Sequence, residues 1–405
     1  MDYDSLFSAD TASFMRSPVR EIFKRVDLSK IYSFAGGYPS PDAFDLEGVK
    51  QSALQVIDRY GSKALQYNAT QGIPELRQAL SERYGVPLER VQITTSSQQG
   101  IDVCTRVMVD PGDVVLTSNP SYLGALQSFR SYRAHIVGVP HSDDDGEFRA
   151  RYEQAIDQCK RQGRKVMFLY MIPDFQNPSG ETLPLSQRRL LVELAREHGF
   201  VIVEDSPYRE LRYRGQDVPT IYSLDPDCVL HLGSFSKILA PGLRLGWILG
   251  NPQLLDQIYV CKQSLDLCAP VLDQYIATQF VTSGRLDANI EKIKGLYSRR
   301  CQGMQELLAR YMPQGVTWTR PDGGLFLFLT MPKGFDAVKF YDRALDNGVA
   351  YVAGSFFHPD GSGLNTMRLN FSFMNLERID KGLQLLARLI GEELDALGLR
   401  CDARQ

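Results

Sequence analysis

Between about residues 90 and 250, short runs rich in β-branched and apolar residues alternate with stretches of helical periodicity. The predicted strands are Val91–Thr95, Val114–Ser118, His135–Val139, Val166–Met171, Phe200–Glu204, Val229–Leu232 and Gly246–Leu249. One helical stretch, Ser186–His198, ends on a basic residue followed by Gly199, which is a typical helix stop. Parallel strands need such crossover helices, and these cover both faces of the sheet. The alternation therefore predicts an α/β fold with a mainly parallel, doubly wound sheet in a large domain, residues 56–285.

The pattern changes after about residue 285. We expect a long helix, Leu286–Arg310, then further strands and a final helix from about Asn375. The strands predicted here are Val316–Thr319, Leu325–Leu329, Val349–Val352 and Met367–Phe373. This order of helices and strands predicts a smaller α+β domain over residues 286–405. The N-terminal segment, residues 1–55, combines a short amphipathic helix (Ser17–Lys24) with an extended Gly/Pro stretch, and we expect it to pack with the small domain.

Composition excludes several classes of protein. Of 405 residues, 43% are hydrophobic, which is typical of a globular chain. The 45 Lys+Arg and 48 Asp+Glu leave a net charge of −3, so the sequence favours no nucleic-acid-binding surface. No run approaches the roughly 20 apolar residues that span a bilayer, and no basic, apolar leader pattern is evident. We therefore expect a cytoplasmic protein with neither nucleic-acid nor membrane partners.

The cysteines, histidines and glycines exclude further classes of protein and of binding site. The seven cysteines form no Cys-x-x-Cys pair, so reduced, mostly structural thiols are the better interpretation. The five histidines show no metal-ligand spacing, and no metal site is predicted. No phosphate-binding Gly-x-x-x-x-Gly-Lys loop or dinucleotide-binding Gly-x-Gly-x-x-Gly follows a plausible strand. The chemistry must come from elsewhere in the chain.

Polar motifs follow three of the predicted strands, at the edge of an open α/β sheet where ligands bind. Val166–Met171 leads to Asn177-Pro178-Ser179-Gly180, and Phe200–Glu204 leads to Asp205-Ser206-Pro207-Tyr208. Val229–Leu232 leads to Ser234-Phe235-Ser236-Lys237, with Arg244 shortly after. Singly, these have ordinary interpretations: a turn, a helix cap, a surface lysine, a structural ion pair. Together, on one edge of one sheet, they indicate a site.

The set matches what pyridoxal phosphate requires. That cofactor needs a lysine to hold its aldehyde covalently and a carboxylate to keep its pyridine nitrogen protonated. Lys237 and Asp205 fit these two needs. Asn177 and Tyr208 can supply donors to the ring hydroxyl oxygen. We therefore predict a pyridoxal phosphate site.

The phosphate and the ring face of the cofactor need further partners. Ser234, Ser236 and Arg244 offer hydroxyls and a cation. The turn Ser96-Ser97-Gln98-Gln99-Gly100 lies between a strand and a helix that begins near Ile101, and a helix N-terminus favours anions. Within it, Ser97 and Gln98 are the candidate contacts. Tyr122, in a turn after Asn119-Pro120, is positioned to stack on the ring.

These motifs give the sequence a strong resemblance to the class I/II, fold-type-I pyridoxal-phosphate aminotransferases, from about Ser17 to the final helix. The most specific are Gln176-Asn177-Pro178-Ser179-Gly180, Glu204-Asp205-x-Pro207-Tyr208, Ser234-x-Ser236-Lys237 and Pro241-Gly242-Leu243-Arg244. Within the class the chain is most similar to the α-aminoadipate/kynurenine branch. That similarity rests on Ser17-Pro18-Val19-Arg20, Phe34-Ala35-Gly36-Gly37-x-Pro39, Leu65-Gln66-Tyr67, Gly72-Ile73-Pro74-Glu75-Leu76-Arg77 and Ser97-Gln98-Gln99-Gly100.

The resemblance also implies substrate contacts. Arg368, in Met367-Arg368-Leu369-Asn370, matches the arginine that clamps the substrate α-carboxylate, a task that suits its bidentate guanidinium. Gly37 matches a backbone contact to the same carboxylate, and Asn177 also faces substrate. Tyr67 matches a tyrosine that reaches the phosphate of the partner subunit, which implies a homodimer with shared sites. Arg20 matches an arginine that meets the distal part of the substrate in relatives, although an exposed helical arginine is an equal interpretation.

Three positions depart from the pattern of the relatives. Tyr38, Asp45 and Asp174 stand where aliphatic, proline and small or hydroxylated residues are usual. We expect them to lie where the substrate side chain is sorted. Dicarboxylic, aromatic and aliphatic amino acids all stay compatible with the sequence.

The implied activity is ping-pong transamination between an L-amino acid and a 2-oxo acid such as 2-oxoglutarate or pyruvate. Lys237, Asp205 and Tyr208 are the expected catalytic groups, with Lys237 as the general base. A β-lyase, decarboxylase, racemase or oxidase of the same fold is the alternative. A third interpretation, the sensor domain of a transcriptional regulator, needs a preceding DNA-binding domain; the motifs begin by Ser17, so we do not expect one.

Overall fold

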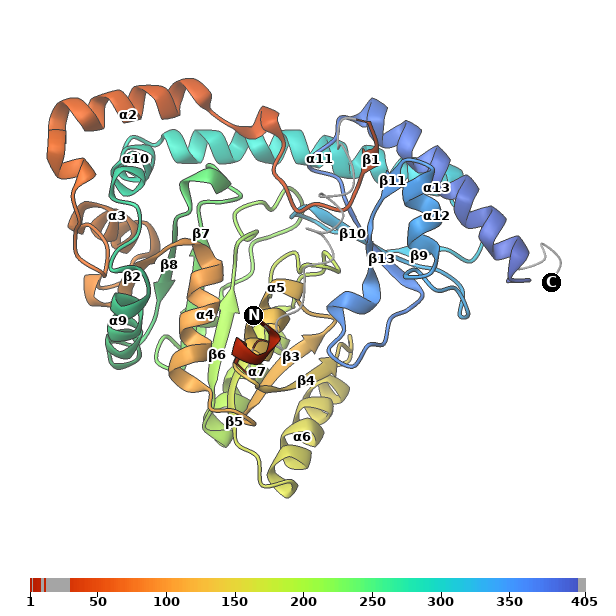
Figure 1. The fold of residues 1–405 in the computed structure, drawn as a ribbon, viewed down its shortest axis with the longest axis horizontal. Helices are drawn as coiled ribbons and strands as arrows, with labels where there is room; N and C mark the ends of the chain where they lie inside the picture. Colours follow the sequence, from red (N-terminus) through yellow and green to blue (C-terminus); the bar gives the residue numbers. More distant parts are fainter. Residues whose placement is uncertain (2, 9–10, 12–29, 400–405) are drawn as a thin grey trace.

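The computed structural model describes residues 1, 3–8, 11 and 30–399 (Figure 1). The predicted helix Ser17–Lys24, and with it Arg20, lies outside the described residues. Within the described ranges, no helix combines the length and the apolar character needed to cross a bilayer.

Among the described residues, the large sheet has seven strands in the order β2-β8-β7-β6-β5-β3-β4. The strands are β2 (Val91–Thr94), β3 (Val114–Asn119), β4 (His135–Pro140), β5 (Val166–Met171), β6 (Val201–Asp205), β7 (Val229–Ser234) and β8 (Gly246–Leu249). β8 runs antiparallel to both of its neighbours, and the other pairings are parallel. The predicted mainly parallel α/β sheet is confirmed.

Helices cover both faces of this sheet. The helices of this part of the chain are α2 (Leu46–Tyr60), α3 (Pro74–Tyr84), α4 (Ser96–Met108), α5 (Leu123–Ser131), α6 (Asp145–Arg161), α7 (Leu185–His198), α8 (Ile221–Leu224), α9 (Pro252–Asp266) and α10 (Val271–Thr282). Of these, α2 packs on α10 at the periphery. Gly100 of α4 packs on Leu232 of β7, whereas the backbone of α8 bonds to Glu204 beside His231. His231 and Leu232 are consecutive in a strand and point to opposite faces, so α4 and α8 lie on opposite sides of the sheet.

A smaller sheet is built from the C-terminal part of the chain. It has the order β12-β13-β10-β9 and is antiparallel, and a separate parallel pair joins β1 to β11. These strands are β1 (Tyr32–Ser33), β9 (Thr317–Trp318), β10 (Phe326–Thr330), β11 (Val349–Ala350), β12 (Val352–Ala353) and β13 (Thr366–Asn370). The accompanying helices are α11 (Arg285–Tyr311), α12 (Phe340–Asp346) and α13 (Leu376–Ala396). The β1–β11 pair brings the N-terminal segment against this C-terminal part.

The single strand predicted at Val349–Val352 is wrong, because the chain changes partners within it. Val349 and Ala350 pair with β1, whereas Val352 and Ala353 pair with β13. Tyr351 between them is fully buried and donates its hydroxyl to a backbone carbonyl at 2.6 Å. The predicted domain division stays a prediction; residue 55 falls inside α2, and α11 begins at residue 285.

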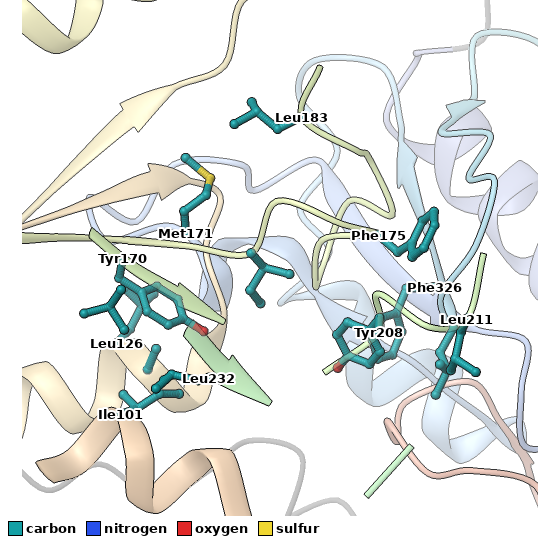
Figure 2. Packing of buried hydrophobic residues seen from close by; sticks show 14 of the residues in the cluster. Ile101, Leu126, Tyr170, Met171, Phe175, Leu183, Tyr208, Leu211, Leu232 and Phe326 are labelled. Atoms are coloured by element: carbon teal, nitrogen blue, oxygen red, sulfur yellow. The ribbon is translucent and has the colours of Figure 1, made fainter. Parts of the chain in front are cut away.

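Apolar packing joins the large sheet to the smaller one. Ile101, Leu126 and Tyr170 fill the space between helices and the large sheet (Figure 2). Further along, Tyr208 meets Phe326 of β10 edge to face, with ring centroids 5.7 Å apart. The two sheets therefore share one continuous core, which sets the position of β10 and β13 relative to the carboxyl ends of β5, β6 and β7.

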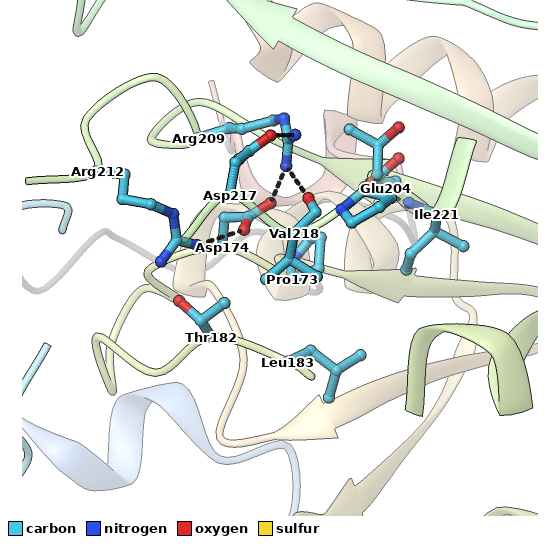
Figure 3. Close-up of polar contacts among 12 residues, drawn as sticks. Pro173, Asp174, Thr182, Leu183, Glu204, Arg209, Arg212, Asp217, Val218 and Ile221 are labelled. Atoms are coloured by element: carbon cyan, nitrogen blue, oxygen red, sulfur yellow. Dashed lines mark hydrogen bonds and ion pairs between the residues drawn. The ribbon is translucent and has the colours of Figure 1, made fainter. Parts of the chain in front are cut away.

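A buried charge cluster supports the loop after β5. Asp174 has no exposed surface and accepts from Arg188 at 2.7 Å. It also accepts from Arg209 at 3.2 Å and Arg212 at 3.4 Å (Figure 3). Arg188 is itself fully buried. Asp174 is thus the counter-charge of a buried cluster.

Replacing Asp174 with alanine should destabilise the fold strongly. The change leaves the buried guanidinium of Arg188 without a carboxylate, which typically costs about 3–5 kcal/mol. Urea unfolding followed by circular dichroism measures the loss. Asp217→Ala is the matched control, since Asp217 bonds the same cluster through Arg209 but is largely exposed, and about 0–1 kcal/mol is expected there. Equal losses for the two variants would contradict the interpretation.

Candidate active site

A cavity of about 250 Å³ opens at the carboxyl ends of the parallel strands. Nine of the residues predicted from sequence line it: Ser97, Gln98, Tyr122, Asp205, Tyr208, Ser234, Ser236, Lys237 and Arg244. They come from five different segments, which meet because β3, β6 and β7 run in the same direction and end together.

Asp205, the last residue of β6, forms the floor of the cavity. Its Oδ2 accepts the hydroxyl of Tyr170 at 2.7 Å, whereas its Oδ1 is buried without any hydrogen-bond donor. Burial raises the pKa of Asp205 to about 6, although the Tyr170 hydroxyl and His231 pull the pKa in the opposite direction. An unpartnered buried carboxylate oxygen is costly, and a cationic N–H group would satisfy it.

Lys237 projects into the same cavity. Its Nζ donates to the carbonyl oxygen of Gly37 at 2.8 Å, which links β7 to the N-terminal segment. Burial lowers the pKa of Lys237 to about 8, and the nearby cations Arg368 and Arg244 add to this effect. More of the amine is therefore neutral near neutral pH than for an ordinary lysine, as a nucleophile or general base requires.

One end of the cavity is formed by two residues in the left-handed conformation. Ser96 has a φ of 68° and Arg244 a φ of 52°. The guanidinium of Arg244 donates to the hydroxyl of Ser96 at 2.6 Å. Gly246 completes the contact, because a Cβ there would lie 2.7 Å from the backbone of Ser96. The first turn of α4, with its free N–H groups, and a guanidinium thus face the same space, which suits an anion.

Asp266 stabilises this end of the cavity through hydrogen bonds to the turn that forms it. Its Oδ2 accepts from the hydroxyl of Thr95 at 2.8 Å and from the side-chain amide of Gln99 at 2.7 Å, and its Oδ1 accepts from Lys262 at 2.7 Å. Gln99 in turn accepts the backbone N–H of Thr95 at 2.7 Å. Burial raises the pKa of Asp266, but these donors outweigh burial and hold the pKa below its usual range. The turn Thr95–Gln99 is therefore anchored to the end of α9.

Arg368 of β13 lies beside the cavity and contacts Asn177. Its Nη1 donates to Oδ1 of Asn177 at 2.8 Å, and its Nη2 donates to the carbonyl oxygen of Ala35. Asn177 also approaches the hydroxyl of Tyr208, at 3.5 Å. The four groups join β5, β6, β13 and the N-terminal segment in one arrangement.

The guanidinium of Arg368 is a buried cation without a carboxylate. Only 4% of the residue is exposed, and no ion pair is formed to it within residues 30–399 or the described N-terminal positions. It lies 4.3 Å from the ring centre of Phe326 and 5.1 Å from that of Phe357, and its Nε has no acceptor. Burial lowers the pKa of Arg368 to about 10. A planar guanidinium that lies among aromatic rings and has no carboxylate partner is suited to bind the carboxylate of a ligand.

Several predicted residues lie away from the cavity. Tyr67 is 75% exposed and Tyr38 is 43% exposed, and neither lines it. Arg20 lies outside the described residues. The expectation that Asp45 and Asp174 sort substrates is wrong: Asp174 belongs to the buried arginine cluster, and Asp45 caps α2 through the N–H of Gly48 at 2.9 Å. Both positions are explained by local charge and helix capping.

Sequence reasoning missed some residues of the site. Tyr170, which bonds Asp205, sits inside a strand where an aromatic residue is ordinary, so no local signal distinguishes it. Ile172 and Pro207 line the cavity as apolar contacts, and both follow directly from the strand ends that sequence did locate. Asp266 could not be found, because its partners stand about 170 residues earlier in the chain.

Comparison with known proteins gives the family. Residues 35–386 match the family described as aminotransferase class I and II. The aromatic-amino-acid aminotransferase 1 of Thermococcus litoralis is 41% identical over 97% of this chain and 96% of its own. The 2-aminoadipate transaminase of Thermus thermophilus is 36% identical over 96% of this chain and 98% of its own. The chain belongs to the class I and II aminotransferases and is a pyridoxal-phosphate-dependent aminotransferase.

A solved structure agrees with this family. The Pyrococcus horikoshii kynurenine aminotransferase, crystallised with PMP, superposes with a TM-score of 0.92 at 41% identity, covering 97% of this chain and 98% of its own. The predicted family, fold class and enzymatic activity are confirmed.

Replacing Asp266 with asparagine should loosen the anion-binding end of the cavity. The amide of asparagine has a single acceptor oxygen, whereas the carboxylate of Asp266 accepts from Thr95, Gln99 and Lys262 through two. At least one of these donors then meets an N–H group, so the Thr95–Gln99 turn loses support. We expect inorganic phosphate to bind the cofactor-free protein about tenfold more weakly, which corresponds to about 1.4 kcal/mol. Phosphorus NMR titration measures this affinity. Asp256→Asn, an exposed change in the same helix, should leave it unaltered, and wild-type phosphate affinity in Asp266→Asn would reject the role.

Proposed function

We propose that the cavity holds pyridoxal phosphate and that the chain transfers the amino group of an aromatic amino acid or 2-aminoadipate to 2-oxoglutarate or pyruvate. The observation that carries this is the unpartnered Oδ1 of Asp205 in the same cavity as the Nζ of Lys237. The two groups supply the carboxylate and the amine that the cofactor requires. The substrate range is proposed from relatives that act on aromatic amino acids and 2-aminoadipate.

The residues around the cavity fit the parts of the cofactor. Asp205 would hold the pyridine nitrogen, Lys237 the aldehyde carbon, and Tyr122 one ring face. Asn177 and Tyr208 would donate to the ring oxygen. Ser97, Gln98, Ser234, Ser236 and Arg244 would hold the phosphate. When bound, the cofactor supplies a carbonyl carbon that bonds to amines and a protonated ring that accepts the electron pair released at the substrate α-carbon.

The protein groups have separate tasks in this proposal. Arg368 fixes the substrate carboxylate, aided by Asn177 and the backbone of Gly37. Lys237, with a pKa near 8, would take the α-proton at its Nζ and deliver it to the cofactor carbon that had carried the aldehyde oxygen. Asp205 stays ionised once a cation lies against its Oδ1. Tyr38 and Arg20 remain candidates for contact with the distal part of the substrate.

A cytoplasmic homodimer completes the proposal. The segment from α2 to Tyr67 exposes Leu46, Leu54, Leu65 and Tyr67, with exposed fractions of 74%, 58%, 70% and 75%. A run of exposed large apolar side chains is typical of an interface. We infer that a second copy covers this segment and that Tyr67 reaches the phosphate in the partner's cavity.

The primary test is Lys237→Ala. It removes the amine that bonds the cofactor, so the absorbance of the lysine-bound cofactor and amino-group transfer should both disappear. Stopped-flow absorbance with phenylalanine, then with 2-oxoglutarate, should show the wild-type cofactor converted and restored. Lys333→Ala, at an exposed lysine outside the segment from α2 to Tyr67, is the control. Release of ammonia from a β-substituted amino acid, release of carbon dioxide, or formation of the opposite enantiomer, each without amino-group transfer, would favour the β-lyase, decarboxylase or racemase alternative.

Arg368→Lys tests the carboxylate clamp. Lysine keeps the charge but not the planar fork, so kcat/KM for tyrosine should fall about 100-fold, or about 2.7 kcal/mol. Binding of tyramine, which lacks the carboxylate, should not change. Arg388→Lys, at an exposed position of α13, controls for the substitution itself. Equal losses for tyrosine and tyramine would contradict the proposed role.

A further inference from the structure

A second cavity, of about 320 Å³, lies on the face of the large sheet opposite to the α4 face. Its walls include Tyr84, Val86, Pro87, Tyr222, His231 and Leu249. Its volume reaches the lower end of the range of small-molecule sites, which is about 300–1,000 Å³. The residues assigned to transamination do not take part in it.

A buried histidine, held through one ring nitrogen, lines this cavity. His231 is 3% exposed, and its Nδ1 lies 3.0 Å from Oε2 of Glu204. Glu204 also accepts the backbone N–H groups of Ile221 and Tyr222, each at 2.9 Å, which keeps it an acceptor. In the neutral imidazole, the contact with this carboxylate places the proton on Nδ1 and leaves Nε2 as a lone-pair acceptor. Within the described part of the chain, the His231 ring forms its hydrogen bond through Nδ1, to Glu204.

Aromatic rings flank this acceptor on two sides. Tyr84 and Tyr222 each have ring centroids 6.1 Å from that of His231, tilted by 52°. Val86 and Leu249 contribute apolar side chains to the lining of the same cavity. A flat aromatic molecule would bury its faces against these groups, with the geometry that ring pairs favour.

The charges at the rim favour a neutral ligand. Arg90, the cation that lines the cavity, already pairs with Asp227 at 2.7 Å and donates to the carbonyl of Pro226 at 2.9 Å. Its charge is therefore compensated without a ligand. An anionic or cationic molecule would lose hydration on entry without gaining a counter-charge.

We propose that this cavity binds a small, neutral aromatic molecule of the indole or phenol class, whose N–H or O–H donates to Nε2 of His231. The ring occupies the space between Tyr84 and Tyr222. The site is separate from the transamination cavity, and both can be filled at once.

Indole and 1-methylindole provide the sharpest test, because they share a ring system and only indole has a donor. Saturation-transfer NMR on the holoenzyme, with saturating 2-oxoglutarate to fill the substrate site, measures both affinities. We expect indole to bind at least tenfold more tightly than 1-methylindole, the value of one hydrogen bond to a buried acceptor. Equal affinities, or loss of indole binding when 2-oxoglutarate is added, would overturn the proposal.

Two variants test whether the ligand binds in this cavity. His231→Phe keeps an aromatic ring and removes Nε2, so the preference for indole over 1-methylindole should vanish. Ser223→Trp adds a large side chain at an exposed position of the rim and should abolish binding of both molecules. Transamination by Ser223→Trp should match wild type, which shows that the protein is folded even if His231→Phe is not. Undiminished indole binding in Ser223→Trp would refute the location.

Discussion

The structure depends on one constraint, that parallel strands running side by side end at the same edge. β5, β6 and β7 are consecutive parallel strands, so the segments that follow them meet at one place. Asn177, Asp205 and Lys237 are brought together by that edge alone. The antiparallel β8 then returns the chain from Arg244, which places a cation at the same edge. Every other contact of the site is added to this arrangement.

Within that edge, cations and carboxylates are unevenly distributed. Lys237, Arg244 and Arg368 face the site, and Asp205 is the carboxylate among the cavity-lining residues. Elsewhere the buried charges are compensated within the chain, as for Asp174 with its three arginines. This contrast explains why a chain with nearly neutral net charge suits ligands that carry phosphate and carboxylate groups. Anion binding comes from a few placed groups in a desolvated setting.

Much of the fold was predictable because its signals are local. Apolar runs marked β2 to β8 to within one or two residues, and the His198-Gly199 stop marked the end of α7. Most of the residues that line the cavity were predictable because they follow a strand end within a few residues. The Val349–Val352 strand was mispredicted for the opposite reason. Its residues read as one apolar run, but two different partner strands compete for them, and the buried Tyr351 marks the change.

The sequence by itself determined the sheet, the strand ends and the chemical types of residue gathered there, because these follow from periodicity and motif over short stretches. Only the tertiary structure decided which side chains support them. In the folded chain, Tyr170 donates to Asp205, and Asp266 anchors the Thr95–Gln99 turn. Asp174 is the buried counter-charge of an arginine cluster. These pairings join residues from 14 to 171 positions apart, and their choice depends on how the elements pack. A local pattern carries no information about a partner that only packing brings near.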